Sequence, residues 1–149
     1  MTDCQHDSLG RTIYLTSQAM RHHVDRMLRP FDITTEQLHI LKIIERQITA
    51  TQREICGTAG KSPANTTRIL DRLEKKRLIV RRDNPIDRRS QLVSLTPGGQ
   101  DLARRLSDLF AALSEKIEKH IDRDEAEIVK QVLGRIQQNL VALSEDPGD

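Results

Sequence analysis

Apolar residues recur every three or four positions over most of the chain, which predicts amphipathic helices. The first such stripe covers residues 9–28, and Pro30 marks its end. The second begins after Thr34, which together with Gln37 three residues later has the sequence of a helix-capping box. We expect the inward face of this second helix to carry Leu38, Leu41, Ile44 and Ile48.

Two further helices are predicted in the C-terminal third. Thr96-Pro97 has the sequence of a helix start, and an apolar stripe follows it as far as Ile121. Residues 122–124 break the pattern, and a last apolar stripe ends at Leu143. The chain therefore finishes with two long helices.

The middle of the chain contains shorter elements. Thr51 opens a short helix that runs through Cys56, and Ser62-Pro63 starts another that reaches about Arg77. The period then changes, because β-like stretches at 78–82 and 91–95 flank a polar, turn-prone segment; this pattern predicts a β-hairpin. The expected core face of the second short helix is Thr66, Ile69, Leu70 and Leu73.

The order helix, turn, helix, hairpin predicts a winged helix-turn-helix, so the fold class is mainly α with a small β-hairpin wing. We assign residues 1–33 to an N-terminal dimerisation helix and 34–96 to the DNA-binding domain. Residues 97–149 form a linker helix and a C-terminal dimerisation helix. A homodimer is expected because the apolar stripes of the terminal helices are too long for the central domain alone to bury.

Composition narrows the function. The 149 residues include only three aromatic side chains, those of Tyr14, Phe31 and Phe110. This argues against a β-sandwich and against readers of single-stranded nucleic acid, which stack bases on aromatic rings. No apolar run approaches the length of a membrane span, and no signal core opens the chain. Two cysteines, Cys4 and Cys56, fit a reducing compartment, so we expect a cytoplasmic protein.

Charge is distributed unevenly. Residues 51–95 hold 11 basic and 5 acidic side chains, a net charge of +6, whereas residues 96–149 have a net charge of −4 and the whole chain of +2. A basic segment that coincides with the winged domain indicates a polyanion partner. We therefore expect the protein to bind double-stranded DNA.

The second short helix offers side chains for the major groove. At 100° per residue, Asn65, Arg68, Arg72 and Lys76 fall on one stripe beside the core face. Arginine pairs with guanine and asparagine with adenine. Small polar residues in the first turn, Ser62 and Thr67 among them, allow close approach to DNA, and free N–H groups there can bind phosphate. Thr66 is expected to pack inward instead.

The predicted wing carries two arginines at its tip, Arg88 and Arg89, which can enter a minor groove. Asp87 would be repelled by phosphate. We therefore predict that its carboxylate orients a neighbouring arginine through paired hydrogen bonds. The alternative is an exposed ion pair of little energetic value.

These segments resemble the MarR family of bacterial regulators. Residues 64–79 are similar to that family's recognition helix. The run Asn84-Pro85-Ile86-Asp87-Arg88-Arg89 followed by Leu95-Thr96-Pro97-Gly98-Gly99 resembles its wing, whose pattern is Asp-x-Arg and then Leu-Thr-x-x-Gly. The resemblance implies that the first and last helices build a dimer. It also implies that Thr67, Arg68 and Arg72 serve the major groove and Arg89 the minor groove.

One position departs from the family pattern. Arg77 stands where relatives commonly have glycine at the helix C-cap. We expect Arg77 to leave the helix in an ordinary conformation and to add a phosphate contact. The dimer should present two recognition helices about 34 Å apart, one turn of DNA, to a pseudo-palindromic operator.

The resemblance does not determine which chemical signal the protein responds to. Family members respond to small aromatic acids, to cysteine oxidation or to zinc. Gly10 replaces the reactive cysteine of the family's peroxide sensors, and Cys56 is expected to be a buried small hydrophobe. The linker helix has no histidine through residue 119 to complete a zinc site with His39, so we predict neither metal nor cofactor.

A small phenolic or anionic effector that releases a repressor from DNA is therefore the preferred hypothesis. Its pocket candidates are Tyr14, Phe31, His39 and Phe110, which are equally plausible as core residues. A metal- or thiol-responsive regulator and a winged-helix module for protein contacts are the alternatives. The sequence contains no phosphate loop, no His-Glu-x-x-His and no nucleophile elbow, so we do not expect an enzyme.

Overall fold

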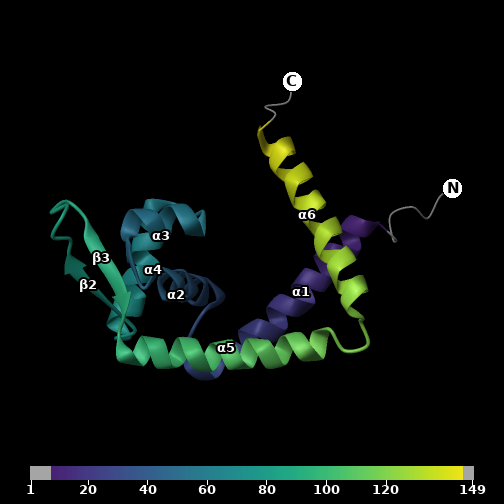
Figure 1. The fold of residues 1–149 in the computed structure, drawn as a ribbon, viewed down its shortest axis with the longest axis horizontal. Coiled ribbons are helices and arrows are strands. Elements are labelled where there is room, and N and C mark those ends of the chain that lie inside the picture. Colours follow the sequence, from purple (N-terminus) through teal and green to yellow (C-terminus); the bar gives the residue numbers. More distant parts are fainter. Residues whose placement is uncertain (1–7, 146–149) are drawn as a thin grey trace. The chain divides into compact units, whose positions relative to one another are not determined.

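The computed structural model describes residues 8–145, and Cys4 lies outside them. Residues up to Arg105 form one compact unit and those from Leu106 onward a second. The elements, of which Figure 1 labels all but η1 and β1, are α1 (Leu9–Leu28), a 3-10 turn η1 (Arg29–Phe31), α2 (Thr35–Gln47), β1 (Thr49–Thr51), α3 (Gln52–Ala59), α4 (Pro63–Lys75), β2 (Ile79–Asp83), β3 (Gln91–Leu95), α5 (Pro97–Ile117) and α6 (Arg123–Glu145). A mainly helical fold with a small β wing is thereby confirmed.

The predicted helix starts are confirmed by their caps. Thr34 accepts a hydrogen bond from the Gln37 backbone N–H, and the Gln37 side chain accepts one from the Thr34 N–H. Ser62 caps α4 by accepting from the Asn65 N–H at 3.3 Å, with Pro63 at the first helical position. Pro30 lies in η1, just after α1 ends.

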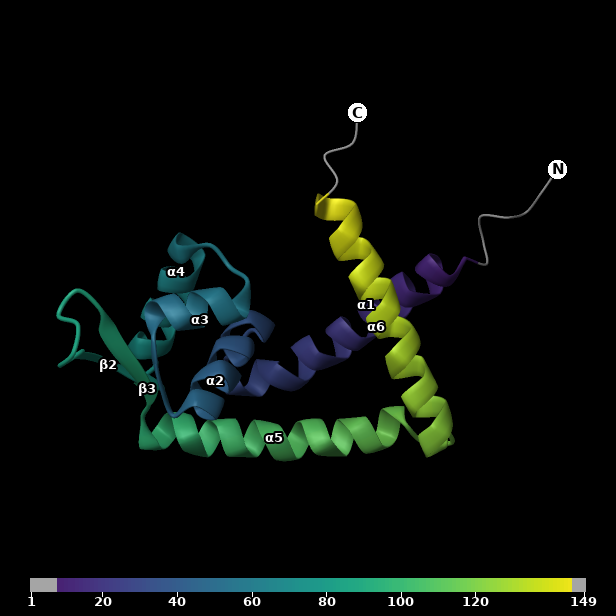
Figure 2. The same cartoon turned by 45° about the horizontal axis from the view of Figure 1, so that its top comes forward.

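The first unit has its core between α2, α3, α4 and the sheet (Figure 2). Thr66 is buried, and its hydroxyl donates to the Ser62 carbonyl at 3.0 Å, so the inward orientation is confirmed. The fully or nearly fully buried apolar side chains from these elements are Leu38, Ile40, Leu41, Ile43, Ile44, Ile55, Ile69, Leu70, Leu73, Ile79 and Val93.

The sheet has three strands in the order β1-β3-β2, not the two of a simple hairpin. Ala50 of β1 and Arg81 of β2 both lie opposite Val93 of β3, and both pairings are antiparallel. The expectation for Ile48 was wrong: it is 80% exposed and has a φ of 63°, because the chain leaves α2 there to enter β1. Three residues are too short a run to show a strand pattern.

The exit from α4 also differs from expectation. Arg77 has a φ of 57°, the left-handed conformation that glycine adopts readily. Its N–H donates to the Glu74 carbonyl at 2.8 Å, and the Leu78 N–H donates to the Leu73 carbonyl at 3.0 Å. This pair of bonds defines a Schellman motif, which satisfies carbonyls at the helix end despite the arginine side chain.

The family pattern Leu-Thr-x-x-Gly has a structural reason at this exit. The Thr96 hydroxyl donates to the Arg77 carbonyl at 2.7 Å and accepts from the Gly99 N–H at 3.0 Å. The Thr96 N–H donates to the Leu78 carbonyl at 3.0 Å. A Cβ at position 99 would lie 2.0 Å from that carbonyl oxygen, so only glycine fits. Thr96 and Gly99 thus fasten the start of α5 to the end of α4.

The second unit contains the rest of α5 and α6. The stripe expected to continue to Ile121 stops being helical at Ile117, and His120 takes a φ of 68° before α6 begins. Asp122 and Glu125 form reciprocal cap bonds of 2.8 and 2.9 Å at the new helix start. Among the described residues, no helix is long and apolar enough to cross a membrane.

Candidate nucleic-acid interface

The solvent side of α4 carries the arginines expected there. Arg68 and Arg72 are exposed one turn apart, and Asn65 is half-buried one turn before them. Ile69, Leu70 and Leu73 on the other side are buried, so the helix cannot turn these arginines inward without losing its core. Two guanidinium groups are thereby fixed along one exposed stripe.

Thr67 is held from both sides. Its hydroxyl donates to the Pro63 carbonyl at 2.9 Å and accepts from the Gln52 side-chain amide at 2.6 Å. Gln52 is the first residue of α3, so this bond joins the two helices of the helix-turn-helix. Thr67 remains partly exposed and keeps its place on the first turns of α4.

Lys76 requires a correction. The helical wheel placed it on the exposed basic stripe, but its ammonium donates to the backbone carbonyl of Asp32 and lies 3.0 Å from the Asp32 carboxylate. It also donates to the Gln37 side-chain oxygen at 3.3 Å. The start of α2 lies within reach of its long side chain, and the wheel carries no information about such tertiary partners. Lys76 therefore ties α4 to the segment before α2.

The wing tip is ordered by hydrogen bonds within the loop. The Asn84 amide donates to the Ser90 hydroxyl at 2.9 Å, and the Asn84 side-chain oxygen accepts from the Ile86 N–H at 3.0 Å. Arg88 and Arg89 are both exposed at this tip. The loop thus presents two positive charges on a defined backbone.

Asp87 orders the wing by a different bond from the one expected. Its carboxylate accepts from the Arg89 backbone N–H at 3.0 Å, and its carbonyl accepts from the Ser90 N–H at 3.0 Å. In the described part of the chain, no ion pair joins Asp87 to a wing arginine. Asp87 therefore shapes the turn from which Arg89 projects, while both guanidinium groups stay available.

A groove of about 890 Å³ separates the wing tip from the start of α4. It is lined by Arg53 of α3, by Pro63 at the start of α4 and by Arg89 of the wing. Arg53 is exposed and was not among the sequence candidates, because it stands outside the stripe of α4. Cys56 also lines the groove and is half-buried rather than buried; its thiol donates to the Lys61 carbonyl at 3.0 Å.

A carboxylate that sequence reasoning missed lies beside this basic surface. Glu36, near the start of α2, accepts a hydrogen bond from the Lys61 ammonium at 2.9 Å. This bond and the charge of Lys61 lower the pKa of Glu36, and the charges of Arg68 and Arg72 lower it further. Glu36 is therefore ionised at neutral pH and moderates the positive field over α4.

The effector-pocket candidates occupy different surroundings. Tyr14 is 59% exposed, and its hydroxyl accepts from the Gln18 amide at 2.9 Å. The Phe31 ring is half-buried and lies 5.2 Å from the Arg105 guanidinium, a cation–π distance. His39 is exposed and lines a groove of about 550 Å³ on α1 and α2, whereas Phe110 is half-buried in the second unit.

No group of three metal-ligating side chains occurs among residues 8–143. His39 shares its groove with Asp25 and Glu36, but the carboxylate of Asp25 accepts from the Thr35 hydroxyl at 2.8 Å and that of Glu36 from Lys61.

Comparison with known proteins identifies the framework. Residues 33–91 match the model of the MarR family. The multiple antibiotic resistance protein MarR of Escherichia coli is 30% identical over 129 residues, which cover 86% of this chain and 90% of that protein.

Solved structures agree with the sequence match. A MarR variant from E. coli complexed with operator DNA has a TM-score of 0.77 and 30% identity, covering 86% of this chain and 92% of that one. The S. aureus MepR–DNA complex has a TM-score of 0.80 and 26% identity, covering 91% and 99%. These matches agree with the helix order and the wing described above. The chain belongs to the MarR family of DNA-binding transcriptional regulators, not to a family of enzymes.

Proposed function

We propose that the protein represses transcription by binding a pseudo-palindromic DNA operator as a dimer. The observation that carries this proposal is the exposed pair Arg68 and Arg72 on a helix whose opposite face is buried. In this scheme α4 enters the major groove, where Arg68, Arg72 and Asn65 reach base edges. Ser62, whose hydroxyl accepts from the Asn65 N–H and still has its own proton to donate, contacts phosphate, and Thr67 faces the major groove beside Arg68.

The wing supplies the second contact. Arg89 enters the adjacent minor groove and Arg88 contacts its rim, because narrow A·T-rich grooves attract guanidinium groups. Arg53 lines the same groove as Arg89, so it contributes a phosphate contact near the wing. Lys76 is left out of these contacts, since Asp32 and Gln37 hold its ammonium.

MarR-family regulators act as dimers, and this chain has the surfaces that such assembly needs. Apolar side chains more than half exposed lie on α1 at Leu9, Tyr14 and Leu15, and on α6 at Ile128, Val129, Leu140, Val141 and Leu143. Exposed apolar area of this kind favours burial against a partner. A symmetric dimer would space two copies of α4 for two half-sites. As a regulator of bacterial transcription, the dimer would act in the cytoplasm.

The test is binding to a duplex selected from random DNA by the purified protein. Arg68→Ala and Arg89→Ala should each weaken operator binding at least about tenfold, the loss of one specific contact. Arg46→Ala, on the last turn of α2, serves as the matched exposed-arginine control. Light scattering should show an unchanged dimer. Equal affinity for operator in both variants and wild type would refute the assigned roles.

Repression is tested separately from binding. A reporter gene placed behind the selected operator should be expressed at a lower level when the protein is present. Arg68→Ala should restore expression. Increased expression in the presence of the wild-type protein would make it an activator instead.

We further propose that a small anionic effector releases the DNA. The groove at His39 is lined by Arg21 and by the apolar side chains of Met20 and Val24, while its other charges, those of Lys61, Glu36 and Asp25, already have partners within it. Titration with benzoate, a small aromatic acid, should shift the His39 ring resonances and lower operator affinity in parallel. A His39→Ala variant should lose the effect on affinity; release that persists would place the effector elsewhere.

A further inference from the structure

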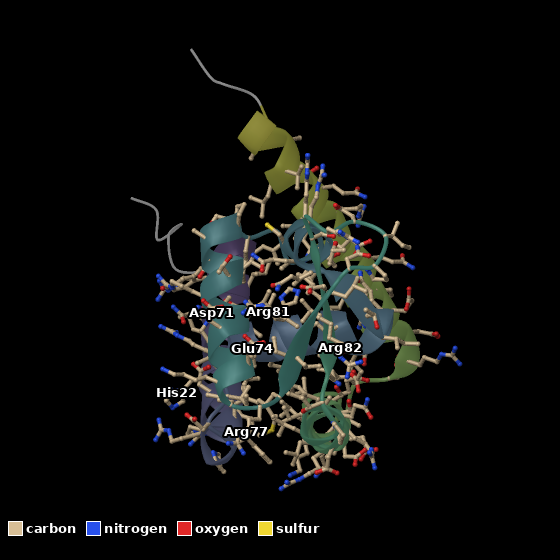
Figure 3. All side chains as sticks on the ribbon, turned by 90° about the vertical axis from the view of Figure 1, so that its left-hand side faces the viewer. His22, Asp71, Glu74, Arg77, Arg81 and Arg82 are labelled. Carbon is tan, nitrogen blue, oxygen red and sulfur yellow. The ribbon has the colours of Figure 1, made fainter. Side chains whose placement is uncertain are left out.

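Arg81 connects the wing to the recognition helix. It lies on β2, and its Nη1 atom is 2.7 Å from a carboxylate oxygen of Asp71 and 2.8 Å from one of Glu74 (Figure 3). Asp71 and Glu74 are three residues apart and neighbours on the surface of α4, so one guanidinium nitrogen contacts two carboxylates of the same helix. The neighbouring Arg82 on the same strand is exposed.

The cation of this link is less exposed than the lysines of three other ion pairs in the first unit, whereas its partners Asp71 and Glu74 are 57% and 43% exposed. The Arg81 side chain is only 14% exposed, against 21% to 28% for the lysines that pair with Glu36, Glu45 and Asp32. Its Nε atom is buried and has no hydrogen-bond partner. A buried charge with an unsatisfied N–H is a poor way to stabilise a fold, because desolvation opposes the attraction. The arrangement therefore indicates a requirement for a fixed geometry.

The position of Arg81 along the ribbon formed by β2 and β3 indicates which movement of the wing the link prevents. Arg81 pairs with Val93 of β3, whose side chain is fully buried at the centre of the sheet. The base of the ribbon is already fastened to α4 through Leu78, Thr96 and Gly99. A second attachment farther along β2 removes the remaining freedom of the ribbon to tilt about that base. The wing tip beyond it then holds one position relative to α4.

We propose that Arg81 is a positioning residue that sets the wing against the recognition helix, so that both can enter adjacent grooves of one duplex. The proposal rests on the proposed DNA contacts of α4 and the wing. Without the Arg81 link, each element would still carry its arginines, but they would no longer be held at the spacing of the two grooves. Loss of Arg81 should therefore reduce the contribution of Arg89 specifically.

The first experiment measures wing position without DNA. Nitroxide labels are attached to cysteines replacing Ile86 at the wing tip and Lys75 on α4, both exposed, after Cys4 and Cys56 have been replaced by serine. Labelled protein is diluted with unlabelled protein, so that most of the dimers that carry any label contain only one labelled chain. Arg81→Met should broaden the distance distribution between the labels, whereas Arg82→Met, which removes the same charge from the same strand, should not.

The second experiment measures operator binding. In the wild-type and Arg82→Met backgrounds, Arg89→Ala should weaken binding about tenfold. In the Arg81→Met background the same substitution should cost less than about threefold, because a mobile wing has already lost most of its contact. Glu74→Gln, which leaves Asp71 as a partner for Arg81, provides a second background if Arg81→Met folds poorly. In this background the cost of Arg89→Ala should lie between the other two values.

The outcomes separate the two hypotheses. An unchanged label distribution in both Arg81→Met and Glu74→Gln overturns the positioning role, whatever happens to DNA binding. If Arg89→Ala weakens binding in the wild type and costs the same in the Arg81→Met background, the positioning role is overturned too. If Arg89→Ala has no effect in the wild type, the proposed minor-groove contact is wrong, while the label measurement still decides the role of Arg81.

Discussion

Both units of the chain contain amphipathic helices, but the apolar faces of these helices differ in burial. Four of the five apolar residues of α2 from Leu38 to Ile44 are no more than 6% exposed, and the fifth is 8% exposed. On α6, by contrast, Ile128, Val129 and Leu140 are 53% to 60% exposed. The winged unit therefore completes its core within one chain, whereas α6 leaves apolar side chains exposed, which favours their burial against a partner.

The difference shows what each unit can tolerate. Close packing in the first unit makes it sensitive to the volume of single side chains. In the second unit, we expect stability to depend on association and thus on protein concentration. Substitutions of the same kind in the two units should have different consequences.

The largest difference in stability between the two units is expected for substitutions of glycine by alanine. Gly99→Ala would place a methyl group 2.0 Å from the Leu78 carbonyl oxygen, so the contact between α4 and α5 must open. We expect a loss of about 3 kcal/mol or more in the free energy of unfolding. Gly134→Ala in α6, where a Cβ meets nothing within 4 Å of the same chain, should instead raise stability by about 0.5–1 kcal/mol.

Urea unfolding followed by circular dichroism measures both glycine variants. Gly98→Ala is the matched control, because its Cβ would lie at the ordinary contact distances of 3.7 Å from Thr96 and 3.9 Å from Arg77. If Gly99→Ala were as stable as Gly98→Ala, the close approach would not constrain the fold.

A carboxylate on the apolar face of α6 should break the dimer and spare the winged unit. Val129→Asp should raise the dimer dissociation constant at least about tenfold, since an ionised group would be buried in the interface. Analytical ultracentrifugation over a concentration series measures this shift. Gln138→Asp introduces the same charge on the opposite side of the helix and should leave the dimer intact. Equal dissociation constants would exclude α6 from the interface.

Two of the residues with positive φ, one in each unit, allow a finer comparison. Arg77 in the first unit and His120 in the second both have positive φ without being glycine, at 57° and 68°. Arg77→Gly and His120→Gly should each stabilise the protein by about 0.5–1 kcal/mol, because glycine removes the Cβ strain but adds unfolded-state entropy. Thermal unfolding at fixed concentration tests this; a fall in Tm for Arg77→Gly would mean that the arginine side chain makes a compensating contact.

The smallest effect concerns pH and is confined to the first unit. The pKa of Glu36 is lowered from 4.5 by Lys61, so the folded state holds the ionised carboxylate more strongly than the unfolded state. Its contribution is present above about pH 4.5 and is lost as pH falls through the lower folded value. Because the side chain is 53% exposed, the contribution should stay below about 1 kcal/mol.

Glu36→Gln tests that window. The difference in Tm between wild type and variant should be largest near neutral pH and should shrink as the pH falls below 4.5. Glu45→Gln, which removes a carboxylate bonded to Lys42 on the same helix, is the control for a general loss of charge. A difference in Tm that grows toward acid would have the wrong sign for this ion pair.

Local signals made the helix starts predictable. Thr34 with Gln37 and Ser62 with Pro63 satisfy the first N–H groups of a helix by themselves, so the sequence carries the information within four residues. The exposed stripe of Arg68 and Arg72 followed from helical geometry in the same way. The Leu-Thr-x-x-Gly pattern was recognised by resemblance, and its cause is the contact with Leu78.

Features that depend on distant partners escaped prediction. β1 is a strand only because Ala50 pairs with Val93, more than forty residues away. Lys76 follows α4 and Arg81 lies on β2, yet carboxylates elsewhere in the fold, those of Asp32 for Lys76 and of α4 for Arg81, hold both away from the proposed DNA contacts. Neither charge nor periodicity distinguishes such residues from those that stay exposed.

The short strand β1 has a further consequence. It covers one side of β3, so the central strand of the wing sheet has hydrogen-bonded neighbours on both sides. The open edges belong to β1, which has only three residues, and to β2, which carries Arg81, Arg82 and Asp83. Short or charged edges disfavour pairing with strands of other molecules. The strand thus protects the wing against edge-to-edge aggregation when many copies gather on neighbouring stretches of DNA.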